Sequence, residues 1–232
     1  MSGQDIRITG EDGDFSGYLA LPPGGSGPGL VVLQEIFGVN AVMRETCDRF
    51  AAAGFVALCP DLFWRLEPGI QLTDRSEAEM KRAFELMGEF NADTSLVDIQ
   101  ATIDHLRRHP ATGDKVGAVG YCLGGQLAYL TACHTDIDAS VGYYGVGLAE
   151  RLNEATHIKK PLLLHIAGHD QFVSSHEQEA MHEGLEPNPL VTLHDYPEDE
   201  HAFARPGGAH FNPTAAKMAD DRTLTFLRDH LG

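Results

Sequence analysis

One cysteine of this chain lies in a pattern that is typical of a catalytic nucleophile. Cys122 stands between Gly120 and Gly124 in the spacing G-x-C-x-G, the nucleophile-elbow pattern with sulfur in place of the usual hydroxyl. Apolar residues in 116–119 predict a short strand before the cysteine, and the leucines in 123–130 predict a helix after it. Glycine on both sides suits such a tight turn, where neighbouring side chains must be small. The alternative is a turn with a buried, inert cysteine, since free cysteine is among the most buried residue types.

A reactive Cys122 needs partners, because only the thiolate is strongly nucleophilic. In α/β-hydrolase chains the order is nucleophile, acid and histidine, with the acid after a late strand and the histidine before the last helix. Asp170 follows the predicted strand 161–166, and His201 lies in the loop before a predicted final helix over 214–231. His201 would accept the thiol proton, and Asp170 would fix its tautomer and stabilise the imidazolium.

Twelve histidines occur in the chain, so His201 has rivals. His165 and His194 lie inside predicted strands, where we interpret them as core or surface residues. The others near secondary structure sit at helix ends, where they complement the helix dipole: His105, His109, His134 and His230. The alternative for His201 itself is a solvated loop histidine beside the acidic run 198–200.

The end of the predicted strand 30–33 carries a further candidate, Glu35. Ligands of parallel sheets bind outside the carboxyl ends of strands, where Glu35 would lie. A plain solvated carboxylate is the alternative, since exposed glutamates are the norm. We expect the backbone N–H groups of Leu123 and Ile36 to form an oxyanion hole for the reaction.

Strands and helices alternate along the chain and must position these residues. Strands are predicted at 6–8, 15–21, 30–33, 55–58, 116–119, 139–144, 161–166 and 190–196. Helices are predicted at 41–53, 76–87, 94–109, 123–130, 148–153 and 214–231, with another that Ser175-x-x-Gln178 would cap. Glycine and proline in 22–29 predict a loop. The alternation predicts an α/β fold, a mostly parallel sheet with helices on both faces, in a single domain over residues 1–232.

Composition narrows the classes of partner. A net charge of −17 argues against nucleic acid and against an anionic membrane surface, because both require a basic footprint. We expect a cytoplasmic protein, because the sequence shows neither a spanning apolar run nor a basic, apolar leader. The four cysteines form no C-x-x-C pair, which predicts reduced thiols. His176, Glu177 and His182 lack the H-E-x-x-H spacing of a metal site.

Several short segments resemble the dienelactone hydrolase (carboxymethylenebutenolidase) family. They are residues 34–40, 43–46, 59–62, 120–125, 142–147 and 201–205. The resemblance implies a single α/β-hydrolase domain that opens a lactone through an acyl-cysteine intermediate, with Cys122, Asp170 and His201 as the triad. It also implies that Glu35 can accept the thiol proton, that Arg205 binds a substrate carboxylate and that Phe37 and Tyr144 contact the substrate. It implies no metal or organic cofactor, and we expect a monomer.

One departure from the family pattern concerns the substrate. The second carboxylate-binding arginine of the family falls opposite Met80, with Lys81 and Arg82 just beyond. Since one residue turns a helix by about 100°, Arg82 would point roughly 200° away from that position. Phe84 and Met87 also replace a tyrosine and a tryptophan of the family's pocket. The alternatives are therefore an esterase or thioesterase for other small esters, a non-catalytic binding protein on this fold, and a redox role for Cys122.

Overall fold

The computed structural model describes residues 3–232 in two compact units, one up to Ala118 and one from Val119 onward. Strand β5 (Thr112–Tyr121) contributes residues to both units. The other elements of the first unit are β1 (Gln4–Thr9), β2 (Asp14–Ala20), β3 (Gly27–Leu33), α1 (Ala41–Ala52), β4 (Val56–Pro60), α2 (Glu77–Glu89) and α3 (Ala92–Arg108). Its strands pair in the order β1-β2-β4-β3-β5.

The first unit combines an antiparallel edge with parallel strands. β1 and β2 form an antiparallel hairpin, as predicted, and β2 pairs antiparallel with β4. β3 runs parallel to β4, and residues 29–33 of β3 are buried. Helix α1 begins after Asn40, whose side chain accepts a hydrogen bond from the Met43 N–H, and it ends before Gly54, where φ is +107°.

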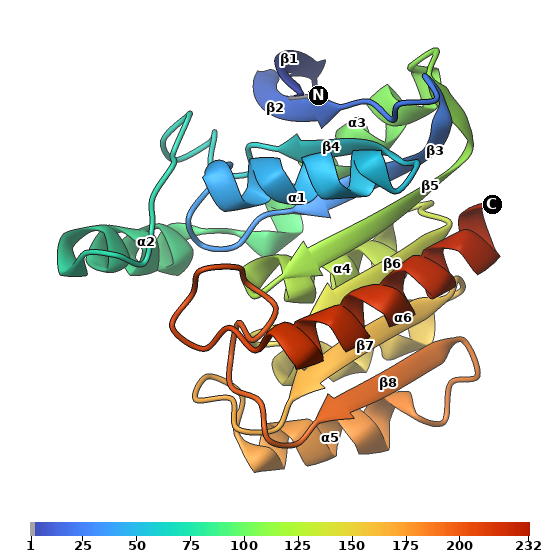
Figure 1. The fold of residues 1–232 in the computed structure, drawn as a ribbon. Coiled ribbons are helices and arrows are strands. Elements are labelled where there is room, and N and C mark those ends of the chain that lie inside the picture. The colour runs from blue at the N-terminus through green and yellow to red at the C-terminus, as the bar shows by residue number, and fades with distance from the viewer. Residues whose placement is uncertain (1–2) are drawn as a thin grey trace. The chain divides into compact units, whose positions relative to one another are not determined.

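The second unit carries most of the predicted chemistry. Its elements after β5 are α4 (Leu123–His134), β6 (Ala139–Tyr143), the 3₁₀ helix η1 (Ala149–His157), β7 (Leu162–Ala167), α5 (Ser175–Leu185), β8 (Val191–Tyr196) and α6 (Pro213–Leu231). The strand order is β5-β6-β7-β8, with β6, β7 and β8 all parallel. Figure 1 shows α6 on one face of these strands and α4 on the other. The carboxyl ends of the strands therefore meet at one edge, and the predicted mostly parallel α/β class is confirmed.

Three local predictions need correction. β3 begins at Gly27 rather than at residue 30. A Cβ on Gly27 would lie 1.9 Å from the Gly54 carbonyl oxygen, so the glycine lets the start of β3 approach the turn before β4 instead of marking a loop. The cap of α5 is Ser174, which forms a capping box with Glu177, and not Ser175. The helix predicted at 148–153 is a longer 3₁₀ helix.

Among residues 3–232, no helix combines the length and the apolar character that crossing a membrane requires.

Candidate active site

Cys122 occupies a strained turn between β5 and α4. Its φ and ψ angles are 58° and −115°, outside the regions that most side chains adopt. The turn leaves no room for a side chain at Gly120, where a Cβ would lie 1.8 Å from the Gly124 carbonyl oxygen. The residue two positions before Cys122 must therefore be glycine, as predicted.

Backbone hydrogen bonds hold the turn against β6 and the loop after it. The Cys122 N–H donates to the Tyr143 carbonyl at 3.1 Å, and the Cys122 carbonyl accepts from Gly125 at 2.9 Å and Val146 at 3.4 Å. Leu123 is the first residue of α4 and is buried. The N–H groups and the positive dipole end of this helix thus lie beside the Cys122 thiol, where negative charge is stabilised.

The two predicted partners of Cys122 form a buried pair. His201 Nδ1 lies 2.8 Å from Asp170 Oδ2, with 8% of the histidine side chain and 1% of the aspartate side chain exposed. The other carboxylate oxygen of Asp170 accepts the Phe172 N–H at 2.8 Å. A carboxylate in this position fixes the tautomer with the proton on Nδ1, which leaves Nε2 able to act as a base.

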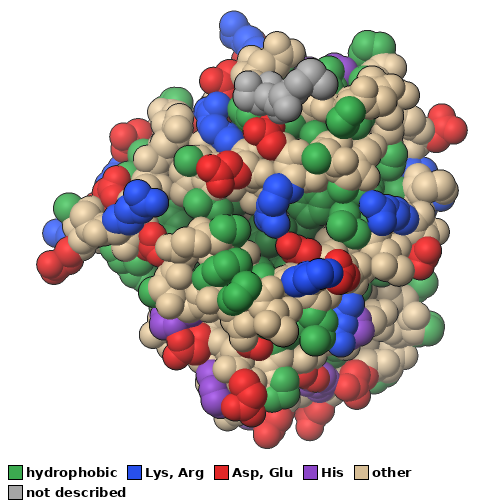
Figure 2. Space-filling view, viewed as in Figure 1, with side chains coloured by type: hydrophobic (Ala, Val, Ile, Leu, Met, Phe, Trp, Pro, Cys, Tyr) green, Lys and Arg blue, Asp and Glu red, His purple; other side chains and the backbone are tan. Residues whose placement is uncertain are grey.

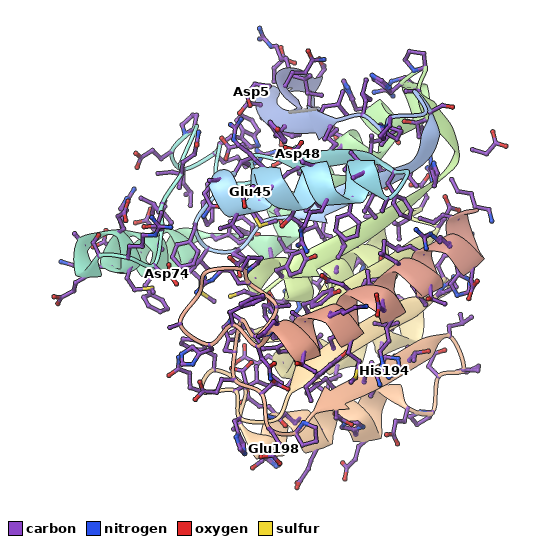
Figure 3. All side chains as sticks on the ribbon, viewed as in Figure 1. Asp5, Glu45, Asp48, Asp74, His194 and Glu198 are labelled. Carbon is purple, nitrogen blue, oxygen red and sulfur yellow. The ribbon has the colours of Figure 1, made fainter. Side chains whose placement is uncertain are left out.

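Two loops of the second unit bring this pair together, because they are bonded to each other. Asp170 follows β7 and His201 follows β8, in the loop that also carries Glu198 (Figure 3). The His169 N–H donates to the Asp199 carbonyl at 2.9 Å, and the Asn212 side chain donates to the Asp199 carboxylate at 2.7 Å. These bonds join the two loops, and His201 between them is only 6% exposed, so the solvated alternative for His201 is wrong.

The charge of His201 responds to both neighbours. Burial by itself lowers the pKa of His201, but the hydrogen bond to Asp170 and the interaction with Cys122 outweigh burial and raise this pKa to about 10. His201 Nε2 is buried and makes no well-formed hydrogen bond to any residue within 3–232. The Cys122 sulfur is thus near enough to the imidazole to favour the imidazolium form. Catalytic hydrogen bonds are often long or poorly aligned before substrate binds.

Aromatic rings enclose the imidazole on two sides. The ring centroids of Tyr144 and Phe172 lie 5.1 Å and 4.8 Å from that of His201, both edge to face. Tyr144 is a predicted site residue with φ of 38°, and its N–H donates to the His165 carbonyl at 2.8 Å. Phe172, which is 41% exposed, was not among the site residues predicted from the sequence. Its position two residues after the predicted acid is the signal that could have found it.

Arg205 shares the loop of His201. Its N–H donates to the Ala202 carbonyl at 2.9 Å, and its side chain is half-buried with Nε fully covered. A Cβ on Gly208 would come within 2.9 Å of that Nε, so the glycine leaves space for the guanidinium. A cation therefore lies four residues after the candidate base.

The remaining predicted site residues belong to the first unit. Glu35, Ile36 and Phe37 follow β3 and are all buried, with at most 4% of each exposed. Glu35 is thus not a solvated carboxylate, which removes that alternative. The Phe37 carbonyl accepts the Leu72 N–H at 2.9 Å, and the Gln34 side chain donates to the Glu35 carbonyl at 3.4 Å. The catalytic and binding roles of these residues stay predictions.

Lys81 and Arg82 face acidic neighbours within the first unit. Arg82 pairs with Glu67 at 2.7 Å and Glu85 at 3.2 Å, and Lys81 lies 3.9 Å from Glu85 with 79% of its side chain exposed. Arg82 thus forms two ion pairs, whereas Lys81 extends into solvent with Glu85 at the limit of ion-pair distance. We therefore assign neither of them to a substrate carboxylate.

The described residues offer no group of three or more His, Cys, Asp or Glu side chains arranged to hold a metal ion. All four cysteines are free thiols and are buried. Figure 2 shows Asp and Glu side chains spread over the face in view among Lys and Arg, in keeping with the acidic composition.

Known proteins resemble this chain over almost its whole length. The sequence model of the dienelactone hydrolase family matches residues 15–231. A protein of Azospirillum brasilense named "Putative carboxymethylenebutenolidase" is 50% identical, over 98% of this chain and 99% of its own. The carboxymethylenebutenolidase of Pseudomonas putida is 40% identical, over 98% and 97%. Among solved structures, a "Putative Dienelactone Hydrolase" from Klebsiella pneumoniae has a TM-score of 0.87 at 26% identity, covering 97% of this chain and 98% of its own.

Proposed function

This chain belongs to the dienelactone hydrolase family and is a carboxylic ester hydrolase with an α/β-hydrolase fold, and from this premise we propose that it opens a lactone with the Cys122 thiol as its nucleophile. The observation that carries the proposal is the buried hydrogen bond between His201 and Asp170 beside the strained Cys122 turn. A thiol, a base and a carboxylate that orients the base are the parts that nucleophilic acyl transfer requires.

In the first half-reaction, His201 Nε2 takes the thiol proton and the sulfur attacks the lactone carbonyl carbon. A C–S bond forms, the ring C–O bond breaks, and the imidazolium returns its proton to the leaving oxygen. Asp170 supports the imidazolium throughout, because it accepts the hydrogen bond from Nδ1–H. The product of this half-reaction is an acyl-cysteine that still holds the opened chain.

In the second half-reaction, His201 takes a proton from water, and the resulting hydroxide attacks the acyl carbon. The C–S bond breaks, the thiolate regains its proton from the imidazolium, and a carboxylic acid leaves. We assign the Leu123 N–H to the oxyanion in both steps, because it is the first N–H of α4. The predicted contribution of Ile36, the predicted proton acceptance by Glu35 and the contact of Phe37 with substrate remain proposals for variants to test.

We propose that Arg205 binds a carboxylate on the substrate. Arginine suits this role because its planar fork can donate two parallel hydrogen bonds. The net charge of −17 does not oppose an anionic substrate, since a local arginine in a low-dielectric site dominates the field near it. Tyr144, whose ring packs on His201, would contact the same substrate.

We further propose that the chain acts as a single-domain monomer in the cytoplasm. The family match over residues 15–231 supports one domain, and four free thiols support a reducing compartment.

Turnover of a carboxylated dienelactone and of an uncharged aryl ester tests the proposal. Wild type should open the lactone, and Cys122→Ala should open it at least about 1,000-fold more slowly. Cys133→Ala, which removes another buried free thiol, is the matched control and should keep the wild-type rate. Arg205→Gln should reduce lactone turnover about 10- to 100-fold, the worth of one charged hydrogen bond, and far more than ester turnover. Arg228→Gln, an exposed arginine of α6, should match wild type.

Preference of wild type for the uncharged ester would favour an esterase for other substrates and would reject the carboxylate. Binding of the lactone without any turnover would favour the non-catalytic alternative. A sulfenic acid on Cys122 under mild peroxide, together with no ester turnover, would favour the redox role.

A further inference from the structure

A chain of hydrogen-bonded polar side chains, buried at its centre and half-buried at its two ends, crosses the second unit beneath the loops of the candidate active site, and the proposed mechanism uses none of them. We call it the α6 tether. Its members come from β6, β7, β8 and α6, and they are Tyr143, His165, Tyr196, Asp220, Arg222 and Thr223.

The direction of each hydrogen bond follows from the acidic end of the tether. Asp220 can only accept, so the single hydroxyl hydrogen of Tyr143 points to its carboxylate at 3.0 Å. The hydrogen in the 2.6 Å contact between Tyr143 and Thr223 must then come from Thr223. The Thr223 oxygen is left to accept from His165 Nε2, which lies 2.9 Å away. His165 therefore carries its proton on Nε2.

The basic end agrees with this tautomer. The Arg222 guanidinium can only donate, and it donates to the Tyr196 hydroxyl at 3.2 Å. Because the His165 proton is on Nε2, Nδ1 accepts, and Tyr196 directs its own hydrogen to Nδ1 at 2.8 Å. Every link is satisfied by one continuous direction, from the arginine to the aspartate.

His165 is held neutral at the centre of the tether. Its ring is fully buried, and burial lowers the pKa of His165 well below the usual value, helped by repulsion from the Arg222 guanidinium and from the protonated form of His194. His194 is labelled in Figure 3, on β8, and its ring stacks 5.9 Å from that of His165. Burial also raises the pKa of Tyr143, which keeps it a neutral phenol. The tether therefore keeps one protonation pattern across the neutral pH range.

The main chain of the same residues holds the candidate active site. The Tyr143 carbonyl accepts the Cys122 N–H at 3.1 Å, which fixes the nucleophile turn. The His165 carbonyl accepts the Tyr144 N–H at 2.8 Å, and the ring of Tyr144 packs against His201. A shift of either side chain in the tether would therefore move a contact of the triad.

The main chain of Tyr196 holds the loop of Asp170 and the loop of His201. Its carbonyl accepts the Gly168 N–H at 2.8 Å and the Asp199 N–H at 3.1 Å. Gly168 is two residues before Asp170, and Asp199 is two residues before His201. The last residue of β8 thus anchors both the acid loop and the histidine loop.

We propose that the α6 tether sets the distance between the Cys122 turn and the His201–Asp170 pair, with His165 as a neutral positioning residue in its centre. The inference rests on the proposed roles of Cys122 and His201. Tyr143 of β6 and His165 of β7 are opposite each other in the sheet, and one helix residue, Thr223, bonds to both side chains through its hydroxyl group, so α6 is fixed against this pair of strands. Rigid support of this kind matters because a displacement of about 1 Å between reacting groups can cost about 100-fold in rate.

Thr223→Val removes this hydroxyl while keeping the shape of the side chain, and it provides the test. Thr223→Ser restores the hydroxyl. Thr225→Val is the matched control, because Thr225 is an exposed threonine of α6 whose hydroxyl donates to the Asp221 carbonyl. We expect kcat for the lactone to fall at least about 10-fold in Thr223→Val with little change in KM. Thr223→Ser should recover most of this loss, and Thr225→Val should match wild type.

A second readout needs no ester. The rate of Cys122 alkylation by iodoacetamide, followed by peptide mass across pH, reports the coupling of Cys122 to His201 directly. We expect Thr223→Val to shift this profile and Thr225→Val to leave it unchanged. A folded Thr223→Val with the wild-type kcat and alkylation profile would overturn the inference. If wild type alkylates as expected but opens no lactone, the proposed substrate is wrong, and the alkylation profiles still decide on the tether.

The tautomer gives an independent check, should Thr223→Val fail to fold. In ¹⁵N-histidine spectra of wild type, His165 should show a proton on Nε2 and remain neutral between about pH 5.5 and 8.5. Tyr196→Phe, which removes only the hydroxyl that meets Nδ1, should shift the His165 signals and reduce kcat. A proton on Nδ1, or a wild-type rate in folded Tyr196→Phe, would refute the proposed chain.

Discussion

Replacing Gly120 by alanine perturbs the candidate active site with a single methyl group. A Cβ at this position would lie 1.8 Å from the Gly124 carbonyl oxygen and 2.3 Å from the carbonyl carbon. Both atoms belong to the first turn of α4, next to the Leu123 N–H and the Cys122 thiol. The obstacle is backbone, so no side chain can rotate to relieve the contact.

The size of the effect follows from the displacement that is needed. Ordinary van der Waals contact begins at 3.4 Å, so the start of α4 and the end of β5 must separate by about 1.6 Å. Overpacking costs about 1–3 kcal/mol where neighbours can adjust, and more where they cannot. We expect Gly120→Ala to lose at least about 3 kcal/mol in the free energy of unfolding. Since a misplacement of about 1 Å costs about 100-fold in rate, kcat/KM should fall by at least that factor.

Gly113→Ala is the matched control, because it adds the same methyl group to the same strand. The nearest atom to a Cβ at Gly113 is 3.8 Å away, and the residue is exposed, so its stability should change by less than about 0.5 kcal/mol. Urea unfolding and lactone turnover are measured on both variants and wild type. Wild-type stability and kcat/KM in Gly120→Ala would refute the steric argument.

Three further predictions concern the acid and histidine loops. Asp170→Asn should lower kcat about 1,000- to 10,000-fold with the fold intact, because the amide favours the wrong His201 tautomer. Circular dichroism checks the fold, and lactone turnover checks kcat. A loss of kcat below tenfold would exclude Asp170 as the orienting acid. The pKa of His201 is raised to about 10, so the interactions of its imidazolium stabilise the folded state fully below pH 6.5. This stabilisation is lost as the pH rises through about 10. The difference in the free energy of unfolding between wild type and His201→Gln should therefore shrink as the pH rises from 6.5 to about 10. A difference that grows with pH would contradict this prediction. Gly168→Ala should lower kcat/KM about 100-fold, because its Cβ would meet the Pro197 carbonyl oxygen at 2.5 Å and push the loop of Asp170 away from the loop of His201. Unchanged kinetics would show that the two loops can separate without loss of activity.

The sequence predicted those features that depend on local sterics or on chain order. The glycine before Cys122 was predictable because any strand-to-helix turn this tight excludes a Cβ there. Asp170 and His201 were predictable because parallel strands place the loops that follow them at one edge. Both arguments need only a few neighbouring residues or the order of elements.

Features that depend on distant partners were not predictable. His165 looked like an ordinary core histidine, because its partner Thr223 lies 58 residues away on the last helix. The ion pair between Arg82 and Glu67 depends on the path of the loop before α2, which no local sequence pattern encodes. Ser174 and Ser175 are both acceptable caps by sequence, and only the start of α5 at Ser175 distinguishes them.

Rapid acid quenching of lactone turnover, followed by peptide mass analysis of wild type and Cys122→Ala, tests the acyl-cysteine most directly. We expect the peptide with Cys122 to carry the mass of the opened lactone in wild type, and Cys122→Ala to give no adduct and at least about 1,000-fold less product. Turnover by Cys122→Ala within tenfold of wild type, with no adduct on Cys122 in the wild-type protein, would contradict the acyl-cysteine mechanism.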